Sequence, residues 1–274
     1  MPHHAAPPFH RRAFVRAGAW LMAGLAFPAA AGPRPGALPL VMTVDDGPLL
    51  APMPLLAPAE RHAALRAALA ATGAPAVLFI TLGFGADRPE GLALARRFAE
   101  DGHRLANHTV THLDLHDPQV TLARYAGEID ACDAVGRTLP NWRRWFRATY
   151  LNAGRDAAER DALQRVLAAR GYRLAEVDLD SRDWQFSAPL QTRLLAEPDP
   201  QAAGVRELRT RFLGQLRERG AALAEQGRRE PGRAQVLLVH DHLPMALWAA
   251  DVVALMHELG FGFVEPERAW PAEG

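Results

Sequence analysis

The stretch Leu40-Val41-Met42-Thr43-Val44-Asp45-Asp46-Gly47-Pro48 joins a short apolar run to two carboxylates and a turn. An apolar run of this length that is bounded by turn residues is typical of a buried strand. Asp-Gly-Pro is ordinary turn chemistry, so the carboxylates alone do not define a site. In parallel α/β sheets, however, functional side chains gather at the carboxyl ends of the strands. The polar residues that follow each apolar run are therefore the candidates for a functional site.

The same pattern recurs along the chain, where short apolar runs alternate with stretches of helical periodicity. This alternation predicts an α/β domain with a largely parallel sheet, and seven β/α steps suit a distorted (β/α)7 barrel. The predicted strands are 40–44, 76–82, 104–106, 145–147, 174–179, 236–239 and 262–264. The predicted helices are 60–71, 91–101, 120–135, 155–170 and 243–259.

Residues 187–233 interrupt this alternation, because they are rich in Arg, Glu and Ala and contain no apolar run of strand type. We predict an added helical segment, with one long amphipathic helix over 204–224. The turn Pro198-Asp199-Pro200 should divide the segment. It is a candidate cover for one side of a substrate groove.

Composition narrows the functional class. The chain has 274 residues, 49% of them hydrophobic, which suits one large domain. Its 31 acidic and 31 basic residues balance, so net charge favours neither nucleic acid nor an anionic membrane as a partner. The single cysteine, Cys132, excludes an internal disulfide and a multi-thiolate metal site. A bound metal would therefore need His and carboxylate ligands.

The first 36 residues have the pattern of an export signal and a short linker. Arg11 and Arg12 precede the apolar stretch 17–31, and a Pro- and Gly-rich stretch follows it. The paired arginines resemble a twin-arginine signal. The apolar stretch is short for a hydrocarbon layer of about 30 Å. We expect an exported protein, periplasmic or secreted, with no stable membrane insertion once the signal is removed, and a catalytic domain over 37–274.

Two histidines follow the third predicted strand in Asn107-His108-Thr109-Val110-Thr111-His112. Imidazoles four residues apart meet one cation if the segment coils into a helical turn. Position 109 is Thr, so the zinc protease pattern His-Glu-x-x-His is absent. His112 and His116 have the same spacing, and the segment alone does not choose between the two pairs.

Further polar groups follow the later strands: Arg147-Ala148-Thr149-Tyr150, Asp180-Ser181-Arg182-Asp183-Trp184 and Leu238-Val239-His240. Together with Asp-Asp-Gly and His-x-x-x-His, their order resembles the five motifs of the polysaccharide deacetylase family, carbohydrate esterase family 4. The resemblance extends over essentially the whole chain after the signal. It implies a distorted (β/α)7 barrel and a metal-dependent hydrolase that removes acetyl groups from a polysaccharide.

The resemblance also implies roles for individual residues. Asp46, His108 and His112 would bind a divalent metal, with zinc expected first and cobalt or nickel as alternatives, which settles the histidine register. Asp45 would be the general base toward a metal-activated water, oriented by Arg147, and His240 the general acid, paired with Asp183. The backbone N–H of Tyr150 would donate to the oxyanion, and Trp184 and Leu238 would surround the acetyl methyl group.

Two positions depart from the family pattern. The third motif usually has proline where this chain has Thr149, which removes a fixed φ before the proposed oxyanion donor. Val44 replaces a common Phe in the first motif, and only packing below the site should change. Neither difference removes a catalytic atom.

Several questions stay open at this stage. A small non-carbohydrate amide is an alternative substrate, and a catalytically silent carbohydrate-binding protein is an alternative function. N-acetyl and O-acetyl groups, the identity of the polysaccharide and the oligomeric state are not determined. His62 and His257 lie on predicted helices, where we expect surface positions, and His103, His116 and His242 are expected to be structural or solvated.

Overall fold

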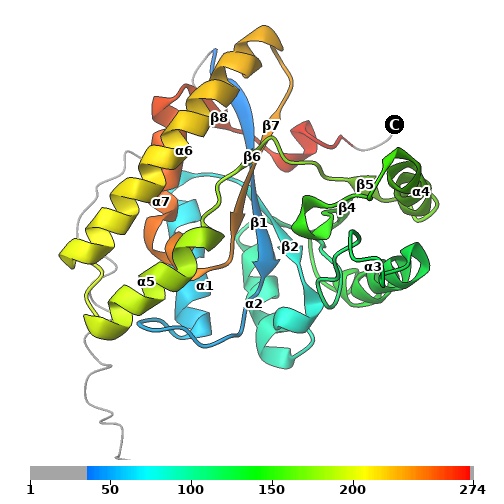
Figure 1. Cartoon of the computed structure of the whole chain (residues 1–274), viewed down its shortest axis with the longest axis horizontal. Helices are drawn as coiled ribbons and strands as arrows, with labels where there is room; N and C mark the ends of the chain where they lie inside the picture. The colour runs from blue at the N-terminus through cyan, green and yellow to red at the C-terminus, as the bar shows by residue number, and fades with distance from the viewer. Residues whose placement is uncertain (1–35, 272–274) are drawn as a thin grey trace, which may run out of the picture.

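The computed structural model describes residues 36–271 of the chain, with a curved parallel sheet at its centre (Figure 1). Within these residues, the strands follow the order β5-β4-β3-β2-β1-β7-β6, and β8 pairs with the start of β1. The strands are β1 (Leu38–Gly47), β2 (Ala76–Ile80), β3 (Arg104–Asn107), β4 (Trp142–Phe146), β5 (Arg173–Leu174), β6 (Leu179–Asp180), β7 (Gln235–His240) and β8 (Phe261–Phe263). The predicted parallel α/β fold is confirmed as a half-barrel with helices outside.

The helices cover the outer face of this sheet. In Figure 1, α6 and α7 lie beside β6 and β7, whereas α3 and α4 lie beside β4 and β5. The α-helices are α1 (Pro58–Thr72), α2 (Pro89–Glu100), α3 (Leu122–Gly136), α4 (Ala157–Ala168), α5 (Trp184–Ala196), α6 (Ala203–Arg229) and α7 (Leu243–Glu258). Within residues 36–271, the short 3-10 helices are η2 (Leu82–Phe84), η3 (Thr149–Leu151) and η4 (Pro266–Arg268).

Alternate side chains of β1 pack into two different apolar cores. Leu40, Met42 and Val44 pack into the larger core between sheet and helices, whereas Val41 joins a core on the inner face of the half-barrel. Successive side chains of a strand point to opposite faces, so Thr43 and Asp45 share the inner face with Val41. β1 pairs with β2, β7 and β8, so it is an interior strand with neighbours on both sides. The end of β1 is consequently held from both sides.

The predicted single strand over 174–179 was wrong. The chain instead forms the short strand β5, which pairs with β4, and the short strand β6, which pairs with β7. These lie at opposite ends of the sheet order. The residues between them therefore cross an open seam of the barrel, where one continuous strand would have no neighbour.

The added helical segment is confirmed, and it begins earlier than predicted. Helix α5 starts at Trp184, the Pro198–Pro200 region separates the two helices, and α6 extends to Arg229. Helix α6 packs beside α7, to which an ion pair between Arg209 and Asp251 connects it. The longer helix of the segment therefore lies beside the sheet.

The predicted export signal falls almost entirely on residues 1–35, which lie outside the described residues. Among residues 36–271, no helix combines the length and the apolar character needed to cross a membrane.

Candidate metal and catalytic site

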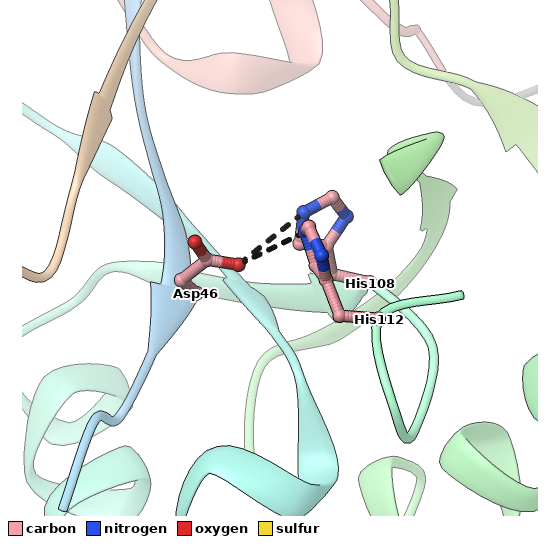
Figure 2. A group of neighbouring side chains, drawn as sticks. All are labelled: Asp46, His108 and His112. Carbon is pink, nitrogen blue, oxygen red and sulfur yellow. Dashed lines mark ion pairs between the residues drawn. The ribbon is translucent and has the colours of Figure 1, made fainter. Parts of the chain in front are cut away.

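Three potential metal ligands meet at the carboxyl ends of β1 and β3 (Figure 2). One ligand atom from each of Asp46, His108 and His112 can be chosen so that all lie within 4.8 Å of one another. The Oδ1 atom of Asp46 lies 3.7 Å from Nε2 of His108 and 3.3 Å from Nε2 of His112. His116 is directed elsewhere, with its Nε2 atom 2.9 Å from the carbonyl oxygen of Gly154. The structure thus brings together the predicted histidine pair.

The tautomer of His108 suits metal binding. Its Nδ1 atom lies 2.8 Å from the carbonyl oxygen of Arg147, a pure acceptor, so Nδ1 carries the proton. The lone pair of Nε2 is then free to face Asp46. Burial lowers the pKa of His108 to about 4, which keeps the ring neutral near pH 7. An imidazole whose second nitrogen is fixed in this way is the usual form of a histidine ligand.

The histidine loop is irregular, so the two rings do not meet through a helical turn. Thr109 and His112 have positive φ values of 73° and 58°. Glu128 of α3 holds this loop: its carboxylate accepts hydrogen bonds from the backbone N–H groups of Val110 and Thr111, at 3.1 and 2.7 Å. The hydroxyl of Thr111 donates to the same carboxylate at 2.7 Å. Tertiary contacts from α3, rather than helical periodicity, bring the two histidines together.

The carboxyl end of β1 presents Asp46 to the histidines. Asp46 has a φ of 67°, in the left-handed region. The next residue, Gly47, is closely packed, because a Cβ atom there would lie 2.5 Å from Leu78 Cδ1 and 3.1 Å from Asp241 Cβ. Strained backbone that surrounding structure maintains is common at functional sites. The Asp-Gly sequence therefore serves close packing as well as the turn.

Asp45 is buried beside Arg147 on the inner face of the half-barrel. Its Oδ2 atom lies 3.6 Å from Nε of Arg147 and 3.8 Å from Nε2 of His108. The guanidinium of Arg147 lies over the Phe79 ring, 4.6 Å from its centroid, and donates to the hydroxyl of Thr43 at 3.1 Å. Burial raises the pKa of Asp45 to about 6, against the lowering effect of Arg147. Arg147 thus opposes the effect of burial on this carboxylate but does not restore its ordinary pKa.

Asp183 and His240 form a buried ion pair beside Asp45. Nδ1 of His240 lies 2.8 Å from Oδ1 of Asp183, whose Oδ2 atom accepts the backbone N–H of His240 at 3.0 Å. Burial lowers the pKa of His240, but Asp183, together with Asp46 and Asp45, outweighs this effect and raises the value to about 9. His240 and Asp45 are register partners on the adjacent strands β7 and β1. A protonated imidazole and a carboxylate with a raised pKa therefore lie next to each other.

The remaining predicted site residues, Tyr150, Trp184 and Leu238, differ in how exposed they are. Tyr150 is 60% exposed, and its ring packs edge-on against His112 with centroids 4.5 Å apart. Its φ of 55° is left-handed. Trp184 is 48% exposed at the start of α5, and Leu238 is buried in β7.

Thr149 compensates for the missing proline with hydrogen bonds. Its backbone N–H donates to the hydroxyl of Tyr125 at 3.1 Å, and its own hydroxyl lies 2.8 Å from the same oxygen. The Thr149 hydroxyl also donates to the carbonyl oxygen of Leu113. Thr149 and Tyr125 are both fully buried. These contacts tie the Tyr150 turn to the loop that follows His112.

The predicted surface position of His62 was wrong, because His62 is 1% exposed. Its Nδ1 atom lies 3.3 Å from Oδ2 of Asp241, which also accepts the backbone N–H of Leu49 at 3.0 Å. The backbone N–H of Asp241 donates to the carbonyl of Asp45. A polar network therefore lies beneath the Asp45–Pro48 turn. This network was not predicted from the sequence, although the position of Asp241 directly after His240 could have indicated it. Glu128 was not predicted either, because nothing in the sequence distinguishes it from other helix residues.

Comparison with known proteins assigns the family. The model of the family described as polysaccharide deacetylase matches residues 34–172. The chain belongs to the polysaccharide deacetylase family. It is 28% identical over 144 residues to an uncharacterized protein, YlxY, of Bacillus subtilis, covering 47% of this chain and 41% of the relative. It is 31% identical over 120 residues to a probable peptidoglycan-N-acetylglucosamine deacetylase of Arthroderma benhamiae, covering 43% and 26%. The chain thus spans less than half the length of these curated relatives.

Solved structures share the fold. The chitin deacetylase of Colletotrichum lindemuthianum superposes with a TM-score of 0.61 at 18% identity, covering 91% of this chain and 94% of that one. A family 4 pseudoenzyme of Bacillus anthracis gives a TM-score of 0.55 at 13% identity, covering 84% and 64%. The same (β/α)7 fold therefore occurs in an enzyme and in a pseudoenzyme. The fold alone does not show activity, which depends on the residues of the site.

Proposed function

We propose that this protein is a metal-dependent hydrolase that removes acetyl groups, N-acetyl before O-acetyl, from a cell-envelope or extracellular polysaccharide. One observation carries the proposal: Asp45 and His240, which pairs with Asp183, lie on adjacent strands beside the Asp46, His108 and His112 ligand set. Family membership supports the same reaction class. The names of the deacetylases that resemble this chain favour an N-acetylglucosamine polymer as the substrate.

The donor atoms fit a divalent cation. Two imidazole nitrogens and one carboxylate oxygen are a ligand set that zinc, cobalt and nickel accept, and zinc is our first expectation. When bound there, such a cation polarises the acetyl carbonyl and lowers the pKa of water. The lone pair of His108 Nε2, left free by the Arg147 carbonyl, is the feature of this structure that argues for a cation.

Asp45 acts as the general base in this proposal. A general base works best when its pKa is close to the working pH, because it is then ionised and still basic. The pKa of Asp45, about 6, is close to neutral pH. Asp45 takes the proton of the attacking water, while Arg147 keeps its carboxylate in place. The backbone N–H of Tyr150 donates to the developing oxyanion.

His240 acts as the general acid. A sugar amine leaves only when protonated, and an imidazolium paired with Asp183 donates that proton from its Nε2 atom. The raised pKa of His240 keeps its imidazole protonated at neutral pH. Trp184 and Leu238 provide apolar surface for the acetyl methyl group, and the 48% exposure of Trp184 leaves the site accessible to a polymer.

The test is acetate release from acetylated chitooligosaccharides and from peptidoglycan, with and without a chelator. We expect release that stops with the chelator and is lost in Asp45→Asn and His112→Ala. His116→Ala is the matched control, because it removes an equally spaced histidine that contacts Gly154 instead of Asp46. No release from any acetylated glycan would refute the proposal. Cleavage of a small amide alone would then favour the non-carbohydrate alternative.

A catalytically silent binding role is the second candidate, because the fold is shared with a family 4 pseudoenzyme. Asp45 and His240 argue against it, since a protein that only binds needs neither a base nor an acid. Glycan binding without acetate release in the presence of added zinc would favour this second candidate. If the protein is exported as predicted, to the periplasm or outside the cell, it would meet a cell-envelope or an extracellular polysaccharide.

A further inference from the structure

Arg219 of helix α6 reaches the loop that carries Asp183. Its guanidinium donates to the carbonyl oxygens of two successive residues, to Asp180 through Nη1 and to Ser181 through Nη2 at 2.8 Å. Its Nε atom donates to the carbonyl of Gln215 within α6. The planar fork of an arginine can hold two carbonyls at once, which a single ammonium group does less well. Arg219 thus joins the added helical segment to the edge of the sheet.

The position of these carbonyls explains why they need a donor. β6 is the terminal strand of the sheet order, with β7 as its one neighbour in the described part of the chain. Backbone groups at a sheet edge lack the partners that another strand would supply. The Arg219 guanidinium takes the place of such a strand at Asp180 and Ser181.

One of the two residues held in this way, Ser181, contacts Asp183 directly. The backbone N–H of Ser181 donates to the carbonyl of Leu238 at 2.9 Å, and its hydroxyl donates to Oδ1 of Asp183 at 2.8 Å. The same Asp183 oxygen lies 2.8 Å from Nδ1 of His240. A continuous series of hydrogen bonds therefore runs from Arg219 through Ser181 and Asp183 to His240.

Helix α6 is fixed in position next to Arg219. A Cβ atom on Gly220 would lie 2.7 Å from Cδ1 of Leu259 and 3.3 Å from Cε of Met256. The helix therefore approaches α7 closely at this point, and Gly220 is buried. Close packing one residue away leaves the backbone of Arg219 little freedom to move.

We propose that Arg219 is a positioning residue for the Asp183–His240 pair, so that the segment 187–233 contributes to catalysis by holding the acid in place. This inference rests on the proposed function of His240 as the acid. Arg219 acts through the backbone of Asp180 and Ser181 and touches neither substrate nor metal. Misplacement of a catalytic group by about 1 Å costs on the order of 100-fold in rate.

The kinetic test compares Arg219→Met and Arg219→Lys with Arg217→Met. Arg217 lies on the same helix, where it forms an exposed ion pair with Glu258, and it is the matched control. We expect Arg219→Met to lower kcat about 10- to 100-fold with KM within about twofold. Arg219→Lys should recover part of kcat, and Arg217→Met should match the wild type. A kcat of folded Arg219→Met within about twofold of the wild type would overturn the proposal.

A double-mutant cycle separates positioning from general stability. If Arg219 acts through Asp183, then Arg219→Met should have little further effect on kcat in an Asp183→Asn background. Independent, additive effects would contradict the proposed route.

Hydrogen exchange followed by mass spectrometry tests the same contact without activity. Peptides covering 179–184 and 238–241 should exchange faster in Arg219→Met than in the wild type, and Arg217→Met should not differ. Unchanged exchange would overturn the proposal. This readout stays valid if the wild type releases no acetate, so failure of the proposed function is distinguishable from failure of the inference.

Discussion

Replacement of Asp183 by Asn should remove the charge that keeps His240 protonated. The two side chains are almost completely buried, 0% and 13% exposed, and their contact is 2.8 Å long. Burial lowers the pKa of His240 and Asp183 is the main group that raises it, so loss of the Asp183 carboxylate should bring the value down toward the ordinary 6.5, with Asp46 and Asp45 still opposing burial. In the wild type it is about 9.

The magnitude follows from this difference. A shift from 6.5 to about 9 corresponds to about 3 kcal/mol of stability for the folded state. Because the folded-state pKa is raised, this stability is fully present below pH 6.5 and is lost as the pH rises through about 9. At pH 8 the protonated fraction of His240 should fall about 30-fold in the variant, from nearly all to a few per cent.

Two measurements check this prediction. NMR titration of His240 in chelator-treated protein should give a pKa near 9 in the wild type and about 6.5 in Asp183→Asn. Urea unfolding should show that the variant is less stable by about 3 kcal/mol at pH 6 and that the difference shrinks toward pH 10. Asp251→Asn, which breaks the ion pair with Arg209, is the control and should leave His240 unchanged. A pKa near 9 in Asp183→Asn would refute the reasoning.

Three shorter predictions concern other parts of the site. Thr149→Val should lower the free energy of unfolding by about 1–3 kcal/mol and reduce kcat, because it removes the hydroxyl that contacts Tyr125. Thr149→Ser keeps that hydroxyl and should stay close to the wild type in both. Thermal unfolding and kinetics will measure the two effects. Asp241→Ala should cost about 3 kcal/mol in urea unfolding, since it leaves His62 buried without its partner. Zinc at 1,000 times its Kd should stabilise the wild type by about 4 kcal/mol, and His108→Ala should abolish the accompanying rise in Tm.

The sequence predicted the sheet and the positions of the chemistry well, because strand ends and turn residues are local signals. Asp45, Asp46 and His240 each follow or end an apolar run, so parallel strands bring them to one edge. The strand over 174–179 was wrong because apolar character does not show whether a neighbouring strand exists. At that point the barrel is open.

The supporting residues were harder to predict, because they depend on contacts between distant elements. Glu128 looks like an ordinary polar residue of a helix, and its role arises only where α3 meets the histidine loop. His62 was expected on the surface because helical periodicity does not show which polar residue faces a buried carboxylate. Arg219 is one of many arginines in 187–233, and its spacing does not set it apart.

The burial of His108 has a consequence for how the proposed metal site would take up a cation. Metal ligands must be deprotonated, and an ordinary histidine therefore releases protons when it binds metal near or below pH 6.5. The pKa of His108 is lowered to about 4 by burial, that of His112 is lowered by burial and by His108, and that of Asp46 is also below its usual value. His108 should therefore release almost no proton when a cation binds at pH 6, and the site should lose less metal affinity in mildly acidic solution than a site built from exposed histidines.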